Sequence, residues 1–405
     1  MKCKLSDICS FRKGKVEVEN LNVKNYISTE NMLPDKCGIT EASSLPTVSL
    51  TQEYKNGNVL VSNIRPYFKK IWQAQYDGGC SNDVLVFVPK PNTDKDFLYY
   101  VLADDDFFTY SMATSKGTKM PRGDKTSIMQ YEVPLIDLQV QKKIASVLKS
   151  LDDKIALNNA INNNLEQQAK TLFKSWFVDF EPFDESFVDS PIGTKIPHSL
   201  QMVQIGSLSH ILETGKRPKG GAVATGVPSI GAENVKRLGE VNFASAKYIP
   251  VEFAQKMDKG KVHGYELMLY KDGGKPGTFI PHFSMFGEGF PYDDFYINEH
   301  VFKLDFGDKG FNEFCYFYLQ TDYPYNWLAN NGGKAAVPGI NQQDVNSIWI
   351  YHPDNPIVKE YCKWIQPIFT TILRNCSQNV KLSQLRDTLL PKLMSGELDV
   401  SDIDI

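Results

Sequence analysis

The residues best suited to chemistry in this sequence are lysines and arginines on turns that contain glycine or proline. Glycine lets the backbone approach a phosphate closely, and Lys or Arg neutralises the phosphate charge. Such turns recur in both halves of the chain, which favours nucleic-acid binding, although any single turn could be an ordinary solvated loop. The candidate cations are Lys13, Lys15, Arg65, Lys69, Lys70, Lys119, Arg122, Lys216, Arg217, Lys219, Lys275 and Lys334.

Catalytic motifs are missing from the sequence. It has no G-x-x-x-x-G-K-[ST] phosphate loop and no Asn-Pro-Pro-aromatic or Asp-Pro-Pro-aromatic tetrapeptide to hold a target amine. The six histidines show no metal-ligand spacing. A nuclease-like cluster of Asp293, Asp294, Glu299 and Lys303 can be imagined, but a solvated strand edge explains that spacing better. We expect no catalytic residue, metal or cofactor in this chain.

The composition limits where such a protein works. The chain has 405 residues, a formal net charge of −4 and seven scattered cysteines. Cysteines without C-x-x-C pairs indicate reduced thiols in a cytoplasmic compartment. No apolar signal region and no run of about 18 apolar residues occur, so we expect neither secretion nor a membrane span. The acidic balance argues against a wholly basic surface but allows a local basic face.

The same pattern of residues is written twice along the chain. Asn158 and Asn375 are 217 positions apart (375 minus 158), and this offset runs from the second half of one domain through the segment after it. Nearer the N-terminus the offset falls to 203 (230 minus 27), where Ile27–Met32 matches Ile230–Val235. Stepwise offsets are what insertions in loops produce. The sequence therefore predicts two copies of one structural unit.

Each copy ends in a long segment with apolar residues at alternating steps of four and three. Such spacing over four heptads or more predicts a coiled-coil helix. Pro134 and Pro356 stand just before the two segments, where proline is tolerated. Pro391 lies inside the second segment, and we expect it to kink that helix or end it early.

The short link after the first helix decides how the two helices pair. A helix from about residue 139 to 175 is about 54 Å long at 1.5 Å per residue. A parallel pair would require the link and the second domain to span that length. We therefore expect an antiparallel pair with one globular domain at each end of a rod.

The antiparallel register brings polar residues together at core positions. It sets Asn158 opposite Asn379 and Asn162 opposite Asn375, as layers that fix register, although these asparagines could instead face solvent. The same register sets Arg386 against a leucine. We expect that end of the seam to be open or to contact a partner.

Several segments together resemble one known family. Leu172–Phe180, which follows the first heptad helix, and Leu389–Gly396 near the C-terminus closely resemble the specificity subunit of type I restriction-modification enzymes. Ile27–Met32 and the turn Thr214–Pro218 resemble the openings of that family's target-recognition domains. The resemblance covers essentially the whole chain.

The resemblance implies a fold and a division of labour. Each recognition domain would read one half of a split, asymmetric double-stranded DNA sequence, and the helices would fix the gap. Two copies of a methyltransferase subunit, which carry S-adenosylmethionine, would dock on the helices, and a motor-nuclease subunit would join for cleavage. Trp176, Phe177 and Phe180 are candidates for a docking patch, although packing against the chain's own second domain is equally plausible.

The predicted fold is α+β, with two mixed α/β recognition domains separated by a long antiparallel two-helix coiled coil of pseudo-two-fold symmetry. The main competing hypothesis is a non-catalytic adaptor that carries two protein-binding domains on the same spacer. A nuclease or methyltransferase acting alone is a third. The expected segments are recognition domains at 1–138 and 198–353, a first helix at 139–180, a linker at 181–197, and a second helix with its tail at 354–405.

Overall fold

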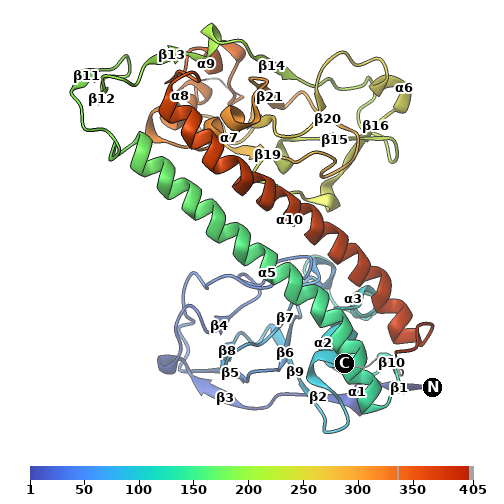
Figure 1. Ribbon diagram of the computed structural model, residues 1–405. Coiled ribbons are helices and arrows are strands. Elements are labelled where there is room, and N and C mark those ends of the chain that lie inside the picture. Colours follow the sequence, from blue (N-terminus) through green and yellow to red (C-terminus); the bar gives the residue numbers. More distant parts are fainter. Residues whose placement is uncertain (335–336, 401–405) are drawn as a thin grey trace. The chain divides into compact units, whose positions relative to one another are not determined.

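The computed structural model describes residues 1–334 and 337–400 of the chain (Figure 1). The chain forms two compact units. Unit 1 consists of Met1–Lys154 and the residues from Leu382 onward, and unit 2 is Ile155–Lys381. Each unit therefore combines a globular part with stretches of two long helices. No helix in the described residues is long and apolar enough to cross a membrane.

Unit 1 contains two four-stranded sheets, in the orders β2-β9-β6-β7 and β3-β5-β8-β4. A separate strand pair joins β1 to β10, next to the start of the first long helix. The elements are β1 (Lys2–Lys4), α1 (Leu5–Ile8), β2 (Cys9–Phe11), β3 (Lys15–Glu17), η1 (Val18–Asn20), β4 (Tyr26–Ile27), β5 (Leu50–Tyr54), β6 (Val59–Ser62), η2 (Pro66–Phe68), β7 (Ile71–Gln73), β8 (Gly78–Cys80), β9 (Val84–Pro89), α2 (Lys95–Ala103), α3 (Asp105–Ala113), α4 (Lys125–Ile128), β10 (Glu132–Pro134) and α5 (Leu138–Phe177).

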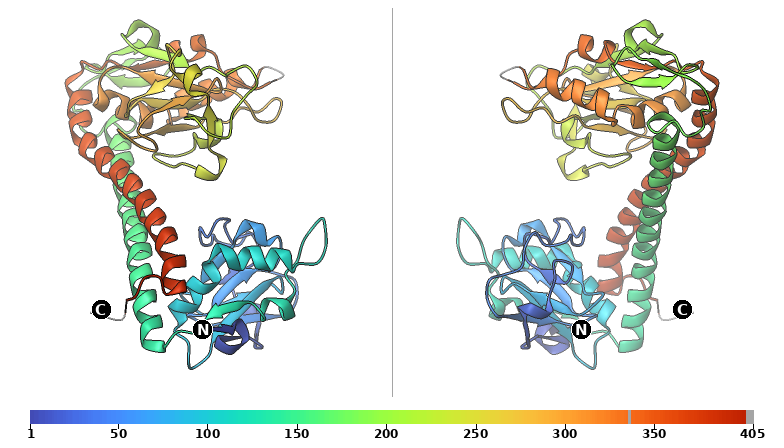
Figure 2. Two further views of the ribbon diagram at one scale, coloured as in Figure 1. Left: turned by 90° about the vertical axis from the view of Figure 1, so that its right-hand side faces the viewer. Right: turned by 90° about the vertical axis from the view of Figure 1, so that its left-hand side faces the viewer.

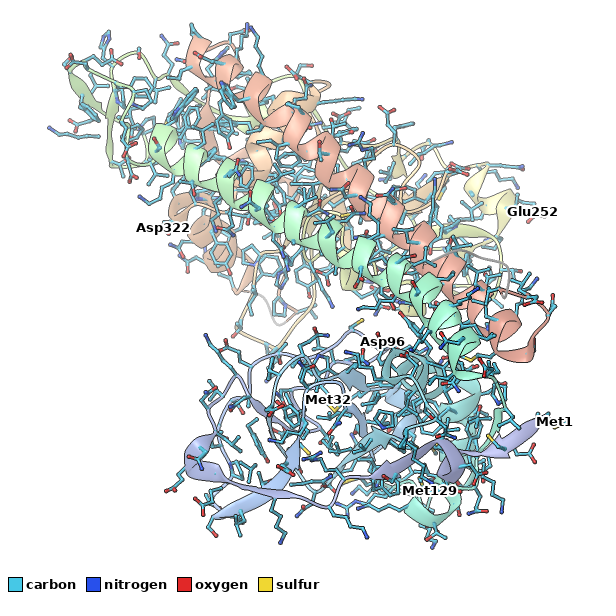
Figure 3. The ribbon with its side chains drawn as sticks, turned by 60° about the horizontal axis from the view of Figure 1, so that its bottom comes forward. Met1, Met32, Asp96, Met129, Glu252 and Asp322 are labelled. Carbon is cyan, nitrogen blue, oxygen red and sulfur yellow. The ribbon has the colours of Figure 1, made fainter. Side chains whose placement is uncertain are left out.

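The core of unit 1 follows from its β-branched and aromatic residues. All four residues of β6 and the first four of β9 are buried, as continuous apolar strands at the centre of a sheet should be. Asp94 begins α2 by accepting hydrogen bonds from the backbone of Asp96 and Phe97, and Phe97 packs beneath the helix. Met32 is fully buried against the second sheet (Figure 3).

Unit 2 also contains two four-stranded sheets, in the orders β14-β21-β18-β19 and β16-β15-β20-β17. A β13–β22 pair stands where unit 1 has β1–β10. The elements are β11 (Phe187–Asp189), β12 (Lys195–Pro197), β13 (Met202–Gln204), η3 (Ile205–Ser207), β14 (Ile211–Thr214), β15 (Val227–Ile230), η4 (Ala232–Asn234), η5 (Phe243–Ser245), β16 (Lys247–Ile249), α6 (Val251–Ala254), β17 (Lys261–Val262), β18 (Leu267–Tyr270), β19 (Phe283–Met285), β20 (Phe295–Ile297), β21 (Val301–Asp305), α7 (Lys309–Tyr318), α8 (Asp322–Gly332), α9 (Gln342–Asn346), β22 (Trp349–Tyr351) and α10 (Pro356–Ser395).

The two units share most of their topology. Their first sheets have the same order, and β9 and β21 begin 217 residues apart, at Val84 and Val301. In the second sheets β5-β8-β4 matches β17-β20-β15, including one parallel pair in each, β4–β8 and β15–β20. The fourth strand differs, because β3 is added beside β5 whereas β16 is added beside β15. The copies therefore diverge at the edges of their second sheets.

The two long helices have 40 residues each and end in recognisable caps. Pro356 is the first residue of α10, and the Asn355 side chain accepts a hydrogen bond from the backbone of Ile357. Gly396, with φ +76°, follows the last helical residue. The prediction that Pro391 ends the helix early is wrong, because α10 continues to Ser395. Pro367 and Pro391 each remove one intrahelical hydrogen bond, and the hydrogen bonds of the other residues continue the helix.

Candidate nucleic-acid interface

Two loops of unit 1 are joined by their backbones. One connects β6 to β7 and the other connects α3 to α4. Arg65 N–H donates to the Pro121 carbonyl (2.8 Å), and Ile64 forms a β-bridge with Arg122. The α3–α4 loop projects from the body of unit 1 (Figure 2). We call this pair the joined loops of unit 1; they bring together the predicted Arg65, Lys69, Lys70, Lys119 and Arg122.

Acidic residues hold several of these cations in place. Lys69 pairs with Asp105 (2.8 Å), and Arg122 pairs with Asp83 (3.2 Å). Burial raises the pKa of Asp105, but hydrogen bonds from Lys36 and Lys69 outweigh burial and hold that pKa below its usual value. Lys70 donates to the Thr29 carbonyl (2.6 Å), and burial lowers its pKa. Lys70 therefore has a structural contact that the sequence pattern did not indicate.

The same join occurs in unit 2. Gly273 N–H donates to the Pro338 carbonyl (2.9 Å), and Asp272 forms a β-bridge with Gly339. Pro338 follows Pro121 by the 217-residue offset, so the backbone contact recurs in the second copy. The loop between β18 and β19, which carries Lys275, has no regular secondary structure, as the sequence indicated. The two copies thus keep one loop geometry but display different side chains.

The remaining predicted cations of unit 2 lie in two places. Lys216 pairs with Asp258 (2.6 Å) and Arg217 with Glu299 (3.7 Å) after strand β14. Lys334, at the end of α8, donates to the Asn331 side chain (2.7 Å). The ion pairs of Lys216 and Arg217 lie at the surface, so these two side chains can readily exchange their carboxylate partners for phosphates.

Six of the predicted cations are exposed and have no ion pair among the described residues. They are therefore the side chains best placed to neutralise phosphates. Lys13 and Lys15 flank Gly14, whose carbonyl accepts from the backbone of Glu53 on β5, and the structure does not join them to the loops at Arg65. The six are Lys13, Lys15, Arg65, Lys119, Lys219 and Lys275.

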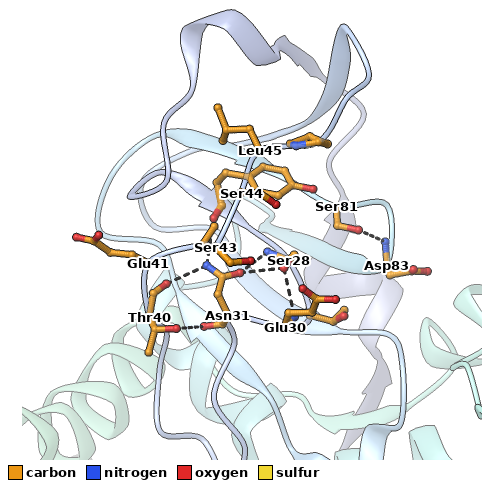
Figure 4. Close-up of a pocket in the computed structure, with 14 residues that line it drawn as sticks. Ser28, Glu30, Asn31, Thr40, Glu41, Ser43, Ser44, Leu45, Ser81 and Asp83 are labelled. Carbon is orange, nitrogen blue, oxygen red and sulfur yellow. Dashed lines mark hydrogen bonds between the residues drawn. The ribbon is translucent and has the colours of Figure 1, made fainter.

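Each unit has a cavity at an equivalent position. In unit 1 a cavity of about 480 Å³ is lined by hydroxyl and carboxyl groups that include Ser28, Glu30 and Asp83 (Figure 4). In unit 2 a cavity of about 160 Å³ is lined by Lys216, Arg217, Lys247 and His300, among others. His300 follows Asp83 by 217 residues. The equivalent position therefore carries a carboxylate in unit 1 and an imidazole in unit 2.

The wall of the unit 1 cavity is built around the buried Asn31. Its side-chain amide donates to the carbonyls of Tyr26 (3.1 Å) and Thr40 (2.9 Å), and its side-chain oxygen accepts from Ser28 N–H (2.6 Å) (Figure 4). These bonds tie strand β4 to the loop that follows it. The segment Ile27–Met32, noticed in the sequence as the opening of a repeated unit, thus shapes this cavity.

The asparagines of the long helices contact one another inside unit 2. Asn158 donates to Asn379 (2.8 Å), and Asn375 donates to Asn162 (2.8 Å), as the sequence register set them. The residue numbers of the paired asparagines rise along α5 and fall along α10, so the stretches of these helices in unit 2 run antiparallel. All four side chains are partly or fully buried. The Asn379 amide also donates a hydrogen bond to the Asn159 side chain.

The expected docking patch on the first long helix is wrong for Phe177. Phe177 is only 3% exposed and packs against Phe314 and Tyr361 in the core of unit 2, so it offers no docking surface. Trp176 and Phe180 are partly buried against the same core. Phe177 therefore follows the alternative expectation, in which it packs against the chain's own second domain.

Arg386 does not leave its end of the helix seam open. It lies 2.6 Å from Asp152, whose other oxygen accepts from the Tyr100 hydroxyl (2.7 Å), all within unit 1. The imagined nuclease-like cluster is also dispersed: Lys303 pairs with Glu213 (2.9 Å), whereas Asp294 pairs with Lys261 (2.9 Å). No group of three metal-ligating side chains occurs among the described residues.

The sequence matches proteins of one kind. Residues 1–167 match the type I restriction modification DNA specificity domain. The MjaIX specificity subunit of Methanocaldococcus jannaschii is 27% identical over 331 residues, which cover 78% of this chain and 72% of that subunit. The HindI specificity subunit of Haemophilus influenzae is 25% identical over 450 aligned positions, with 92% and 94% covered.

A solved structure has the same overall fold. The S subunit of a type I restriction-modification system from M. genitalium matches with a TM-score of 0.58 at 15% identity, over 99% of this chain and 96% of that one. The sequence match assigns the DNA specificity domain to residues 1–167, and the structural likeness shows that the fold is shared. Over most of its length the chain is therefore similar to specificity subunits of type I restriction-modification enzymes.

Proposed function

We propose that this protein gives a type I restriction-modification complex its DNA sequence specificity, with unit 1 reading one half of a bipartite site and unit 2 reading the other. The joined loops carry this proposal. Their backbone contact, Arg65 to Pro121 and Gly273 to Pro338, recurs in both units while their side chains differ. Shared geometry with different side chains suits two different half-sites, because base edges are distinguished by the side chains that reach them.

The chain would act without catalysis. Two copies of a methyltransferase subunit carrying S-adenosylmethionine, and a motor-nuclease subunit, would supply the chemistry. In the proposed division, residues 1–138 and 198–353 are the recognition domains, and the helices at 139–180 and 354–405 form a pseudo-symmetric spacer. The linker at 181–197 contains the hairpin β11–β12. The partly exposed Trp176 and Phe180 remain candidates for partner contact, and the asparagine layers remain candidates for fixing helix register.

Phosphate contacts would come first from the six exposed, unpaired cations. Lys216 and Arg217 would join them by exchanging surface ion pairs for phosphates. Because each phosphate contact releases counterions, binding should weaken steeply with salt, by a factor of about 10³ or more between 50 and 200 mM.

The test is electrophoretic mobility of DNA with the full chain and its methyltransferase partner at several salt concentrations. The proposal requires sequence-specific retardation with a steep salt dependence. A protein-binding adaptor predicts capture of the partner without retardation of DNA. Methylation or cleavage by this chain alone would show that it is an enzyme.

A further inference from the structure

Strained backbone is clustered where the β6–β7 loop of unit 1 meets the loop between β4 and β5. Asp35, Lys36, Arg65 and Lys69 have φ between +48° and +62°, and they are four of the six non-glycine residues with positive φ in the described chain. Left-handed backbone is unfavourable for residues with a β-carbon. It persists where surrounding structure imposes it, and such positions concentrate at functional sites.

Backbone bonds hold the four residues together. Asp35 N–H donates to the Phe68 carbonyl (2.8 Å), and Lys36 N–H donates to the Lys69 carbonyl (3.0 Å). Lys36 and Lys69 both reach Asp105 at the start of α3 (2.8 Å each). The bond from Arg65 to Pro121 fixes the other end of the turn. The short helix η2 is therefore clamped on both sides.

The clamped turn displays two aromatic rings. Tyr67 is 49% exposed and Phe68 is 37% exposed, and their ring centroids are 4.6 Å apart. Exposed neighbouring aromatics lose the favourable burial that such side chains normally gain. Arg65 precedes the rings, and the Lys70 ammonium lies 5.8 Å from the Phe68 ring. The turn thus presents two exposed aromatic rings beside the cations Arg65 and Lys70.

The equivalent loop of unit 2 has a different tip. Residues 273–277 read Gly-Gly-Lys-Pro-Gly and include no aromatic side chain. Three of these glycines have positive φ, which costs glycine little. The same joined-loop geometry therefore carries a stiff aromatic tip in one unit and a glycine-rich basic tip in the other.

We propose that Tyr67 and Phe68 insert at a base step of the half-site read by unit 1 and unstack it, while Arg65 contacts a flanking phosphate. The inference rests on the proposed function. Apolar wedges between base pairs unstack DNA, and aromatic rings stack on any base. The cations Arg65 and Lys70 beside the rings suit DNA, because Lys and Arg side chains neutralise phosphates. The Gly273–Gly277 turn of unit 2 carries no aromatic ring, so we expect no aromatic insertion at its half-site.

The experiment uses the full chain with its methyltransferase partner and a duplex carrying the methylated motif found in its host. Phe68 is replaced by the photocrosslinker p-benzoylphenylalanine, and the same replacement at Tyr76, another exposed aromatic of unit 1, is the control. Affinity is compared for the double variant Tyr67→Ser/Phe68→Ser and for Met112→Ser, whose side chain is also 37% exposed. Permanganate oxidation of thymines reports unstacking.

We expect the crosslink at position 68 to map to bases of one half-site, and not to form at position 76. The double variant should bind about 5- to 100-fold more weakly, the range for losing one stacked base, and should lose the permanganate signal. Met112→Ser should bind normally. Unchanged affinity with specific binding intact would overturn the wedge and leave the proposed function standing. Loss of methyltransferase binding alone would mean that the rings dock protein. Failure of the wild-type chain to bind specifically would overturn both.

Discussion

Glu313 is the most informative side chain to change in unit 2. It lies on α7, is fully buried, and neither carboxyl oxygen has a hydrogen-bond partner among the described residues. Burial raises its pKa to about 9, with Asp308 raising it further and Lys309 lowering it. Tyr361 and Cys362 on α10 also face it. The folded protein therefore holds this carboxyl protonated at neutral pH.

The consequence for stability has a definite sign. The unfolded chain releases the proton above the ordinary pKa of 4.5, whereas the folded chain keeps it until about 9. The contribution of Glu313 to stability is therefore greatest below pH 4.5 and falls as pH rises towards 9, by about 1.4 kcal/mol per pH unit. At pH 7.5, three units above 4.5, Glu313 lowers the free energy of unfolding by about 4 kcal/mol relative to its contribution below pH 4.5.

We expect Glu313→Gln to stabilise unit 2 by up to about this amount at pH 7.5 and by little at pH 4.5, because the amide does not titrate. Urea unfolding followed by tryptophan fluorescence measures it, since four of the five tryptophans lie in unit 2: Trp176, Trp327, Trp349 and Trp364. Glu252→Gln, at an exposed site on α6, is the control. A difference between Glu313→Gln and wild type that stays constant from pH 5 to 9 would refute the reasoning.

Three further changes test other parts of the structure. Phe177→Ala should destabilise unit 2 by about 3–5 kcal/mol, measured by urea unfolding, because it empties a packed aromatic site. Asn162→Ala should cost about 1–3 kcal/mol in the same assay by leaving the Asn375 amide unpaired, whereas the double change Asn162→Leu/Asn375→Leu should recover most of it. Lys119→Ala or Lys275→Ala should each lower the salt dependence of DNA binding by about one phosphate contact and leave the preferred sequence unchanged, which a titration at several salt concentrations would show.

The parts of the fold that depend on periodic patterns could be predicted. The heptad spacing predicted helices close to the observed α5 and α10, and the 217-residue offset predicted shared strands such as β9 and β21. The asparagine pairs followed from the register, because antiparallel helices fix each partner by position. The outcome at Pro391 did not follow, since the last turns of α10 are held by the burial of Leu390 and Leu393 in the core of unit 1, which no local pattern shows.

The details of the candidate site depended on contacts between residues far apart in sequence. The pairing of Lys69 with Asp105 and the clamp between Asp35 and Phe68 join loops that no local pattern connects. Burial of Phe177 likewise depends on α7 and α10, which follow it by more than 130 residues. The sequence did show the cations and aromatics, but not the left-handed backbone that presents Tyr67 and Phe68.

The central claim is that one chain carries two recognition domains of similar fold that recognise two different DNA half-sites. Sequencing the DNA methylation of a host with and without this chain tests that claim most directly. We predict one additional methylated motif, made of two different half-sites separated by unspecified bases. A palindromic motif, or no change in methylation when this chain is added to its methyltransferase partner, would contradict the account.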